Sequence, residues 1–117
     1  MSDPTTHLAL QNTDKAVVAV VRCEKVGSRE AQILETDLRK AAPDRKWRMV
    51  IDLNEVTLLA SMGLGMLVTM HKEASANGGK LAICGLRPEI VQLLKVTHLE
   101  RVLKIHSDRD AALKAVS

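Results

Sequence analysis

The stretch Val50–Val68 reads VIDLNEVTLLASMGLGMLV and carries the clearest structural pattern in the chain. It begins within an apolar run, 49–53, that is long enough for a buried strand and too short for a helix. Residues 54–57 are mostly polar and predict a loop. The small residues around Ser61 then open an apolar-periodic helix over 61–77, which a pair of glycines ends. A buried strand followed by a helix is typical of an α/β fold.

The segments on either side repeat this alternation. Apolar β-branched runs predict strands, and capping residues followed by apolar side chains every three or four positions predict helices. The expected strands cover residues 8–10, 16–21, 49–53, 81–84 and 101–105; the expected helices are 28–42 capped by Ser28, 61–77, one from Pro88 that buries Ile90, Val91, Leu94 and Val96, and a last one capped by Ser107. This order, ββαβαβαβα, predicts an α/β domain with a mostly parallel sheet, opened by an antiparallel hairpin and covered by helices.

The helix over 61–77 also carries a methionine stripe. Met62, Met66 and Met70 recur every four residues, a spacing that places them on one face. We expect this stripe to fill the core, with an adaptable binding face as the alternative. Leu67 and His71 fall on the apolar side of the same helix. Leu67 is expected to face the sheet, and His71 to pack against the core or to make a satisfied hydrogen bond.

The composition is that of one folded domain. Hydrophobic residues make up 46% of the 117 and charged residues 26%, which argues against disorder. We expect a flexible tail at residues 1–7 and the domain at residues 8–117. The chain has one Trp and no Tyr or Phe, and its formal net charge of +3 is spread along the sequence. It therefore lacks both the aromatic platforms and the basic stripe of nucleic-acid-binding proteins.

Other classes of protein are also disfavoured. No apolar run approaches the roughly 18 residues that cross a bilayer, and the N-terminus lacks the regions of a signal peptide. Cys23 and Cys84 form no CxxC motif, and His98 and His106 have no neighbouring ligands at metal-binding spacing. These features predict a cytoplasmic protein with reduced thiols and with no metal, cofactor or membrane insertion.

Two roles are open for Ser61. Its hydroxyl can cap the helix that follows, a contact worth about 1 kcal/mol. It can also accept a phosphoryl group, because the free N–H groups and positive dipole of a helix N-terminus stabilise a phosphate. Serine hydrolase chemistry is not expected, since the sequence places no base and orienting acid beside Ser61. We therefore expect a protein that is not an enzyme.

The same stretch resembles the STAS domain family, whose pattern is a strand ending in Asp-Leu, a Val, and then Asp-Ser-Ser-Gly-Leu-Gly opening a helix. The matching residues are Ile51-Asp52-Leu53, Val56 and Gly63-Leu64-Gly65. The resemblance continues through Ala76-Asn77-Gly78-Gly79, Leu81 to Cys84, Pro88-Glu89-Ile90 and Leu94 to Leu99. It covers nearly the whole chain and implies a single STAS domain.

Small single-domain members similar to this chain are anti-sigma factor antagonists. The resemblance therefore implies a protein that binds an anti-sigma factor, itself a serine kinase of ATPase fold, in a partner-switching pathway. In that family the kinase phosphorylates the antagonist and a serine phosphatase resets it. The surface expected to meet the partner lies on two loops and comprises Val26, Gly27, Ser28, Ala60, Ser61, Met62 and Gly63.

The chain departs from the family pattern on both loops. Met62 stands at the usual phosphoacceptor, the second Ser of Asp-Ser-Ser-Gly, and Ala60 replaces the Asp. The segment Glu24-Lys25-Val26-Gly27 stands where the family often has Gly-Glu-Leu-Asp. Met62 cannot accept a phosphoryl group, so Ser61 is the candidate acceptor if a switch operates. The alternative that Met62 suits is a constitutive, non-phosphorylated accessory subunit of a transporter ATPase.

Overall fold

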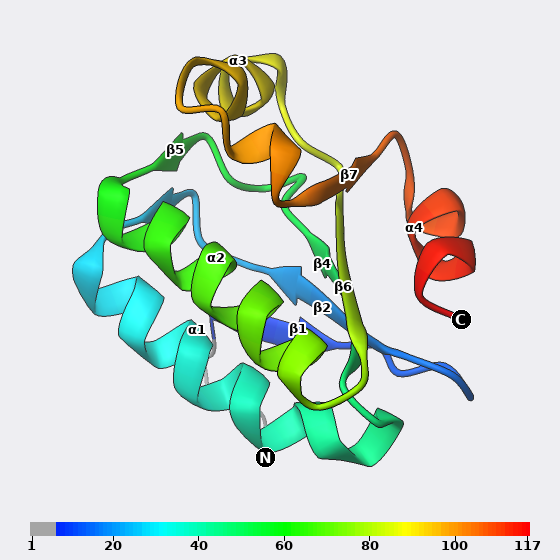
Figure 1. Ribbon diagram of the computed structural model, residues 1–117. Coiled ribbons are helices and arrows are strands. Elements are labelled where there is room, and N and C mark those ends of the chain that lie inside the picture. The colour runs from blue at the N-terminus through cyan, green and yellow to red at the C-terminus, as the bar shows by residue number, and fades with distance from the viewer. Residues whose placement is uncertain (1–6) are drawn as a thin grey trace.

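A five-stranded sheet in the order β1-β2-β4-β6-β7 forms the centre of the molecule. The computed structural model describes residues 7–117, so the predicted tail lies outside the described residues except for its last residue. The strands are β1 (Leu8–Leu10), β2 (Val17–Val21), β4 (Arg48–Asp52), β6 (Lys80–Cys84) and β7 (Lys104–His106). β1 and β2 pair antiparallel and the other neighbours pair in parallel (Figure 1). The predicted fold class is confirmed.

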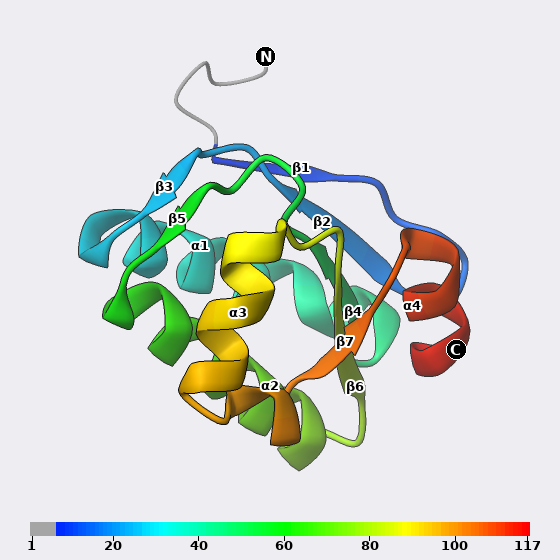
Figure 2. The ribbon, with the colours of Figure 1, turned by 90° about the horizontal axis from the view of Figure 1, so that it is seen from above.

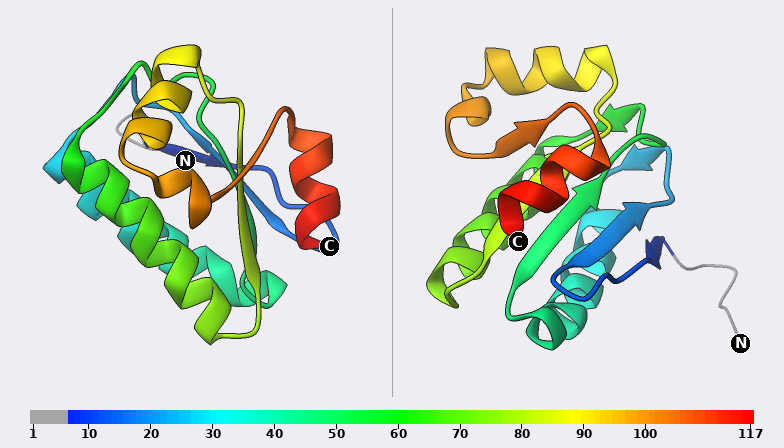
Figure 3. Two further views of the ribbon diagram at one scale, coloured as in Figure 1. Left: turned by 45° about the horizontal axis from the view of Figure 1, so that its top comes forward. Right: turned by 90° about the vertical axis from the view of Figure 1, so that its right-hand side faces the viewer.

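Helices cover both faces of the sheet and one of its ends. α1 (Ser28–Ala41), which continues into the 3-10 helix η1 (Ala42–Arg45), lies beside α2 (Ser61–Ala76) on one face (Figures 1 and 2). α4 (Arg109–Val116) lies on the other face, and α3 (Pro88–Val96) crosses the end at which β4 and β6 finish (Figure 3). Within residues 7–117, every helix is too short or too polar to cross a bilayer.

The strands have continuous apolar runs because they are buried on both faces. In β2, Val17, Ala19 and Val21 belong to the core beneath α1 and α2, while Val18 belongs to the smaller core beneath α4. Side chains alternate across a strand, so one strand supplies both cores. Leu67 of α2 is fully buried in the larger core, as the sequence predicts.

A second, two-stranded sheet is missing from the sequence-based prediction. β3 (Lys25–Val26) and β5 (Leu58–Leu59) pair in parallel, and each leads into a helix: β3 into α1 and β5 into α2 (Figure 2). Strands of two residues are too short to show a period in the sequence. Only the contact between distant segments of the chain makes them recognisable.

Two helix starts differ by one residue from the prediction. Gly27, not Ser28, is the N-cap of α1, and its N–H donates to the Glu30 carboxylate at 3.0 Å. This hydrogen bond lowers the pKa of Glu30, because the backbone N–H stabilises the charged carboxylate. The cap of α4 is Asp108 rather than Ser107, and the Asp108 side chain accepts a backbone N–H at 2.8 Å. A carboxylate there also interacts favourably with the helix dipole.

The last strand begins later than predicted. His98, with a φ of 61°, ends α3 in the left-handed region. The chain then forms the 3-10 helix η2 (Leu99–Arg101), and the Leu103 N–H bonds back to the first residue of η2 at 2.8 Å. Because these residues turn on themselves, β7 begins at Lys104 rather than at Arg101.

Two apolar side chains expected in the core are exposed. Val96 is 65% exposed, since it lies two positions after the buried Leu94 and so on the opposite side of α3. Met62 is 53% exposed, while Met66 and Met70 are buried. The methionine stripe therefore fills the core at two of its positions and leaves the first one on the surface.

Candidate functional site

α2 begins at Ser61, where the sequence places a helix start. Ala60 is the N-cap, with an extended backbone, and its carbonyl accepts the Leu64 N–H at 3.0 Å. The Ser61 side chain is exposed, and in the described part of the chain no side-chain hydrogen bond closes this helix start. The capping role is therefore wrong, because the helix already includes Ser61 as its first residue.

The pairing of β3 with β5 brings the two predicted loops together. The Glu24 carbonyl accepts the N–H groups of Thr57 and Leu58, at 2.8 and 3.1 Å. The Val26 carbonyl accepts the Ala60 N–H at 3.0 Å. These backbone hydrogen bonds hold the start of α1 beside the start of α2, so residues far apart in sequence form one continuous surface.

Two of the predicted contact residues support this surface from below. Val26 is buried, and so is Gly63. A Cβ on Gly63 would lie 2.7 Å from Leu59 Cδ1 and 3.0 Å from the Val26 carbonyl oxygen. Only glycine therefore lets α2 approach β3 so closely. The remaining predicted residues are exposed or half-buried and are called the Ser61 surface below: Gly27, Ser28, Ala60, Ser61 and Met62.

Apolar surface beside Ser61 extends beyond the predicted residues. Leu58 is 54% exposed, and Met62 borders a groove of about 200 Å³ between α1 and α2. The groove walls also include Gln32 and Thr69. Exposed apolar residues beside a groove are typical of protein-binding surfaces. The pair Leu58-Leu59 is the sequence signal for this exposed leucine. Neighbouring side chains on a strand point to opposite faces, so only one of the two can face the core.

The start of α2 favours an anionic group. The first N–H groups of a helix have no partner within the helix, and the aligned peptide dipoles leave a partial positive charge there. The first turn of α2 contains no acidic residue. A phosphate on Ser61 would meet these donors without a neighbouring carboxylate in that turn. The helix start is thus compatible with phosphorylation of Ser61.

A buried carboxylate holds the segment that precedes Ser61. Asp52 ends β4 and is 5% exposed; its Oδ1 accepts the Asn54 N–H at 3.0 Å. Its Oδ2 accepts from Nη2 of Arg109 at 3.1 Å, and Nη1 of the same arginine donates to Gln11 Oε1 at 2.6 Å. Gly85, with a φ of 70°, leaves room for this side chain, since a Cβ there would lie 2.4 Å from Oδ1. The sequence offers no signal for this pairing.

The described residues offer little other chemistry. Burial raises the pKa of both free thiols, Cys23 and Cys84, that of Cys84 to about 11. Both thiols therefore stay protonated near neutral pH, where the thiolate would be the nucleophile. In residues 7–117, no three His, Cys, Asp or Glu side chains gather where they could hold a metal ion.

Comparison with known proteins fits this geometry. A family profile described as the STAS domain matches residues 10–112, a span that includes the strand, turn and helix around Ser61. The chain belongs to the STAS domain family. The STAS match covers most of the chain, as the motif residues predict.

Several relatives and solved structures match this STAS domain over nearly its whole length. BtrV of Bordetella bronchiseptica, a candidate anti-sigma factor antagonist, is 24% identical over 108 residues, which cover 92% of each chain. The crystal structure of an anti-sigma factor antagonist from Mycobacterium paratuberculosis has a TM-score of 0.82 at 23% identity and covers 99% of this chain and 98% of that one. The anti-sigma factor antagonist SpoIIAA in its unphosphorylated form has a TM-score of 0.75 at 13% identity, covering 92% and 95%. SpoIIAA, a cell fate determinant of Bacillus, is also known in a phosphorylated form.

Proposed function

We propose that this protein is an anti-sigma factor antagonist, which binds an anti-sigma factor through the Ser61 surface and so frees a sigma factor. The observation that carries the proposal is the exposed Ser61 and Met62 at a helix start that β3 and β5 fix in place. The names of BtrV and SpoIIAA support the same function. In this proposal, residues 8–117 form one STAS domain, which carries the whole Ser61 surface.

The proposed partner is an anti-sigma factor that is also a serine kinase of ATPase fold, with a serine phosphatase acting in the reverse direction. The role is binding rather than catalysis, and it places the protein in the bacterial cytoplasm, where sigma factors work. The exposed apolar residues Leu58 and Met62 offer the partner surface to bury, and the exposed Ser28 and Ser61 add hydroxyl groups to the Ser61 surface.

Phosphorylation of Ser61 would turn this binding off. A phosphoryl group adds a charge of about −1.5 to −2. That charge would stand among the uncharged Ala60, Met62 and Leu58, where a docking partner must remove its water. The helix start stabilises the phosphate in the free protein, so the modification should penalise the complex rather than the fold.

The test captures partners from an extract of the natural host with the full chain as bait. Wild type and Ser61→Ala should recover an anti-sigma factor with a kinase domain, and Ser61→Asp should lose it. Ser107→Asp is the matched control, because it makes the same chemical change at an exposed serine outside the Ser61 surface. It should recover the partner as wild type does.

Intact-mass analysis of the protein from its own host tests the modification separately. A single phosphoryl group should appear on wild type and be absent from Ser61→Ala. Phosphate on Thr57 or Thr69 would contradict the assignment of Ser61. Recovery of a transporter ATPase by wild type and Ser61→Asp alike would instead support the constitutive accessory subunit, the function that Met62 at the usual acceptor position favours.

A further inference from the structure

A cavity of about 360 Å³ opens at an uncovered part of the sheet edge, away from the Ser61 surface. β7 is paired with residues 82–84 of β6, so it leaves the first part of β6 uncovered. α2 and α4 flank this stretch on opposite faces of the sheet (Figure 3). His71 and Ser75 of α2 line the cavity, and they follow Ser61 by ten or more positions, roughly 15 Å along a helix.

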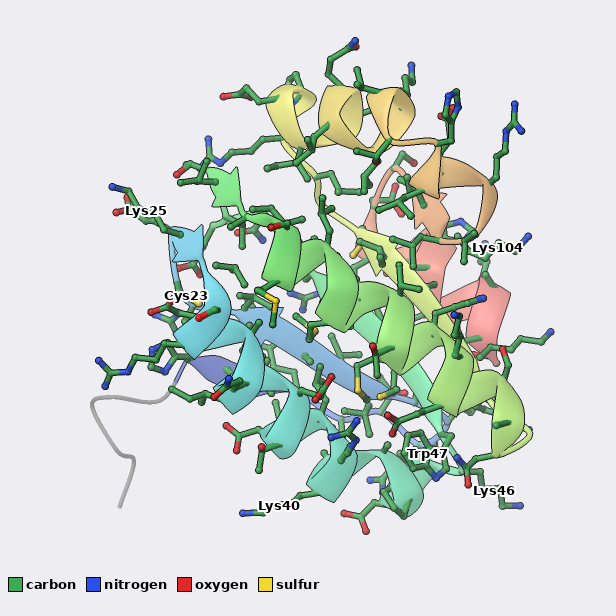
Figure 4. All side chains as sticks on the ribbon, turned by 60° about the vertical axis from the view of Figure 1, so that its left-hand side comes forward. Cys23, Lys25, Lys40, Lys46, Trp47 and Lys104 are labelled. Carbon is green, nitrogen blue, oxygen red and sulfur yellow. The ribbon has the colours of Figure 1, made fainter. Side chains whose placement is uncertain are left out.

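All ionisable side chains that line this cavity are bases. Lys80 and Lys104 are exposed, and His71 and His106 are half-buried. Among the described residues, no Asp or Glu contributes to the walls. Bases gathered without an acid create a positive potential that attracts anions. Figure 4 shows Lys104 on a different part of the surface from Lys25 and Lys40.

The two histidine rings have hydrogen-bonding capacity that the fold leaves unused. His71 Nδ1 and His106 Nε2 are buried and find no partner among the described residues. Buried polar atoms nearly always have a partner, so two such atoms at one cavity require an explanation. An imidazole both donates and accepts in its neutral form and donates twice when protonated. Both nitrogens are covered by neighbouring atoms, so an anion in the cavity would accept a hydrogen bond from each ring only after the ring turns that nitrogen toward the cavity.

The rest of the cavity wall is apolar and firmly packed. Leu81, Ala82 and Val116 are buried side chains of β6 and α4. The volume lies at the lower end of small-molecule sites, about 300–1,000 Å³, which combine an apolar wall with a few polar groups. We propose that this cavity binds an amphiphilic organic anion, a carboxylate or phosphate carried on a short hydrocarbon chain. The lysines and histidines receive the anionic group and the apolar wall receives the chain.

Isothermal titration of the full chain with octanoate and with octyl phosphate tests this site. Both anions should bind at one site per chain, and 1-octanol, which has the chain without the charge, should bind about tenfold more weakly or not at all. The relative affinity of the two anions identifies the preferred anionic group. The double variant Lys80→Met, Lys104→Met should lose about tenfold in affinity, since each ion pair at such an exposed site is worth up to about 1 kcal/mol.

Matched variants and ring spectra make the test specific. The control Lys25→Met, Lys40→Met removes the same charge elsewhere on the surface (Figure 4) and should keep wild-type affinity. Ligand should shift the imidazole nitrogen resonances of His71 and His106 and leave those of the exposed His98 unchanged. The proposal is overturned if neither anion binds, if 1-octanol binds as tightly as octanoate, or if the control variant loses as much affinity as the cavity variant.

Discussion

Asp52, at the end of β4, and Ser61, at the start of α2, lie at the two ends of one short segment. They differ in exposure and in the hydrogen bonds that their side chains make. Asp52 is 5% exposed and bonds to Asn54 and Arg109, so its polar atoms are satisfied inside the fold. Ser61 is exposed, and no capping hydrogen bond of its side chain closes the helix that it begins. A carboxylate buried in this way needs such partners, because a polar group without hydrogen bonds inside the fold is costly. A free hydroxyl needs none and stays accessible to a partner or a kinase.

The difference teaches where to look for function in this domain. Buried residues whose polar atoms are paired inside the fold, such as Asp52, stabilise the fold. Residues that the fold supports without using, such as Ser61 and Met62, form the surface on which binding is proposed. Substitutions should therefore fall into two groups, one that changes the free energy of unfolding and one that changes binding alone.

The largest expected effect tests the contrast within α2. Leu67→Ala removes a fully buried side chain and should lower the free energy of unfolding by roughly 2–5 kcal/mol. Met62→Ala, in the same helix and 53% exposed, should lower it by about 0.5 kcal/mol or less. Urea unfolding followed by circular dichroism measures both. Equal losses in the two variants would show that the buried face of α2 is misassigned.

The next effect compares an ion pair that has one buried partner with a pair that is exposed on both sides. Asp52→Asn removes the charge that faces Arg109, whose side chain is partly exposed, and should cost about 1–3 kcal/mol. Glu55→Gln breaks the exposed pair between Arg22 and Glu55, 3.2 Å apart, and should cost about 0–1 kcal/mol. Unfolding at low and high salt measures the difference. Arg109→Met combined with Asp52→Asn should lose less than the sum of the single losses, because the two residues act together.

Two glycine substitutions in α2 should change the free energy of unfolding by a smaller amount and in opposite directions. They test the close contact of Gly63 with β3 beneath the Ser61 surface. Gly63→Ala adds a Cβ against Leu59 and the Val26 carbonyl and should destabilise by about 1 kcal/mol, the overpacking cost exceeding the gain in helix propensity. Gly65→Ala meets no atom within 4 Å and should stabilise by up to about 1 kcal/mol. Thermal unfolding decides the sign. Stabilisation by Gly63→Ala would show that α2 does not depend on this close approach to β3.

Much of the fold, and less of the site, could be predicted from the sequence. The β-branched runs mark the strands, since burial on both faces demands continuous apolar residues, as in β2. Ser61 as the helix start follows from local pattern as well. The β3–β5 pairing and the contact of Asp52 with Arg109 could not be predicted, because each joins distant segments by backbone or charge contacts that leave no local period. The sequence pattern predicts the caps of α1 and α4 one residue away from Gly27 and Asp108, because a serine that also favours a cap stands beside each of them.

The smallest expected effect on stability is the most informative about Ser61. Ser61→Ala removes no capping hydrogen bond and should change the free energy of unfolding by less than about 0.5 kcal/mol. Ser61→Asp places a carboxylate at the positive end of α2 and should stabilise by about 0.3–1 kcal/mol. Asp108→Ala is the matched control, because Asp108 does cap α4, and its loss should cost about 0.5–2 kcal/mol. Urea unfolding of the three variants measures these free energies. A loss of stability for Ser61→Ala as large as that for Asp108→Ala would mean that Ser61 holds the helix after all.

The stability of Ser61→Asp also decides how its binding is interpreted. If this variant is as stable as wild type or more so, its loss of the anti-sigma factor can be assigned to the charge on the Ser61 surface, since the fold beneath is unchanged.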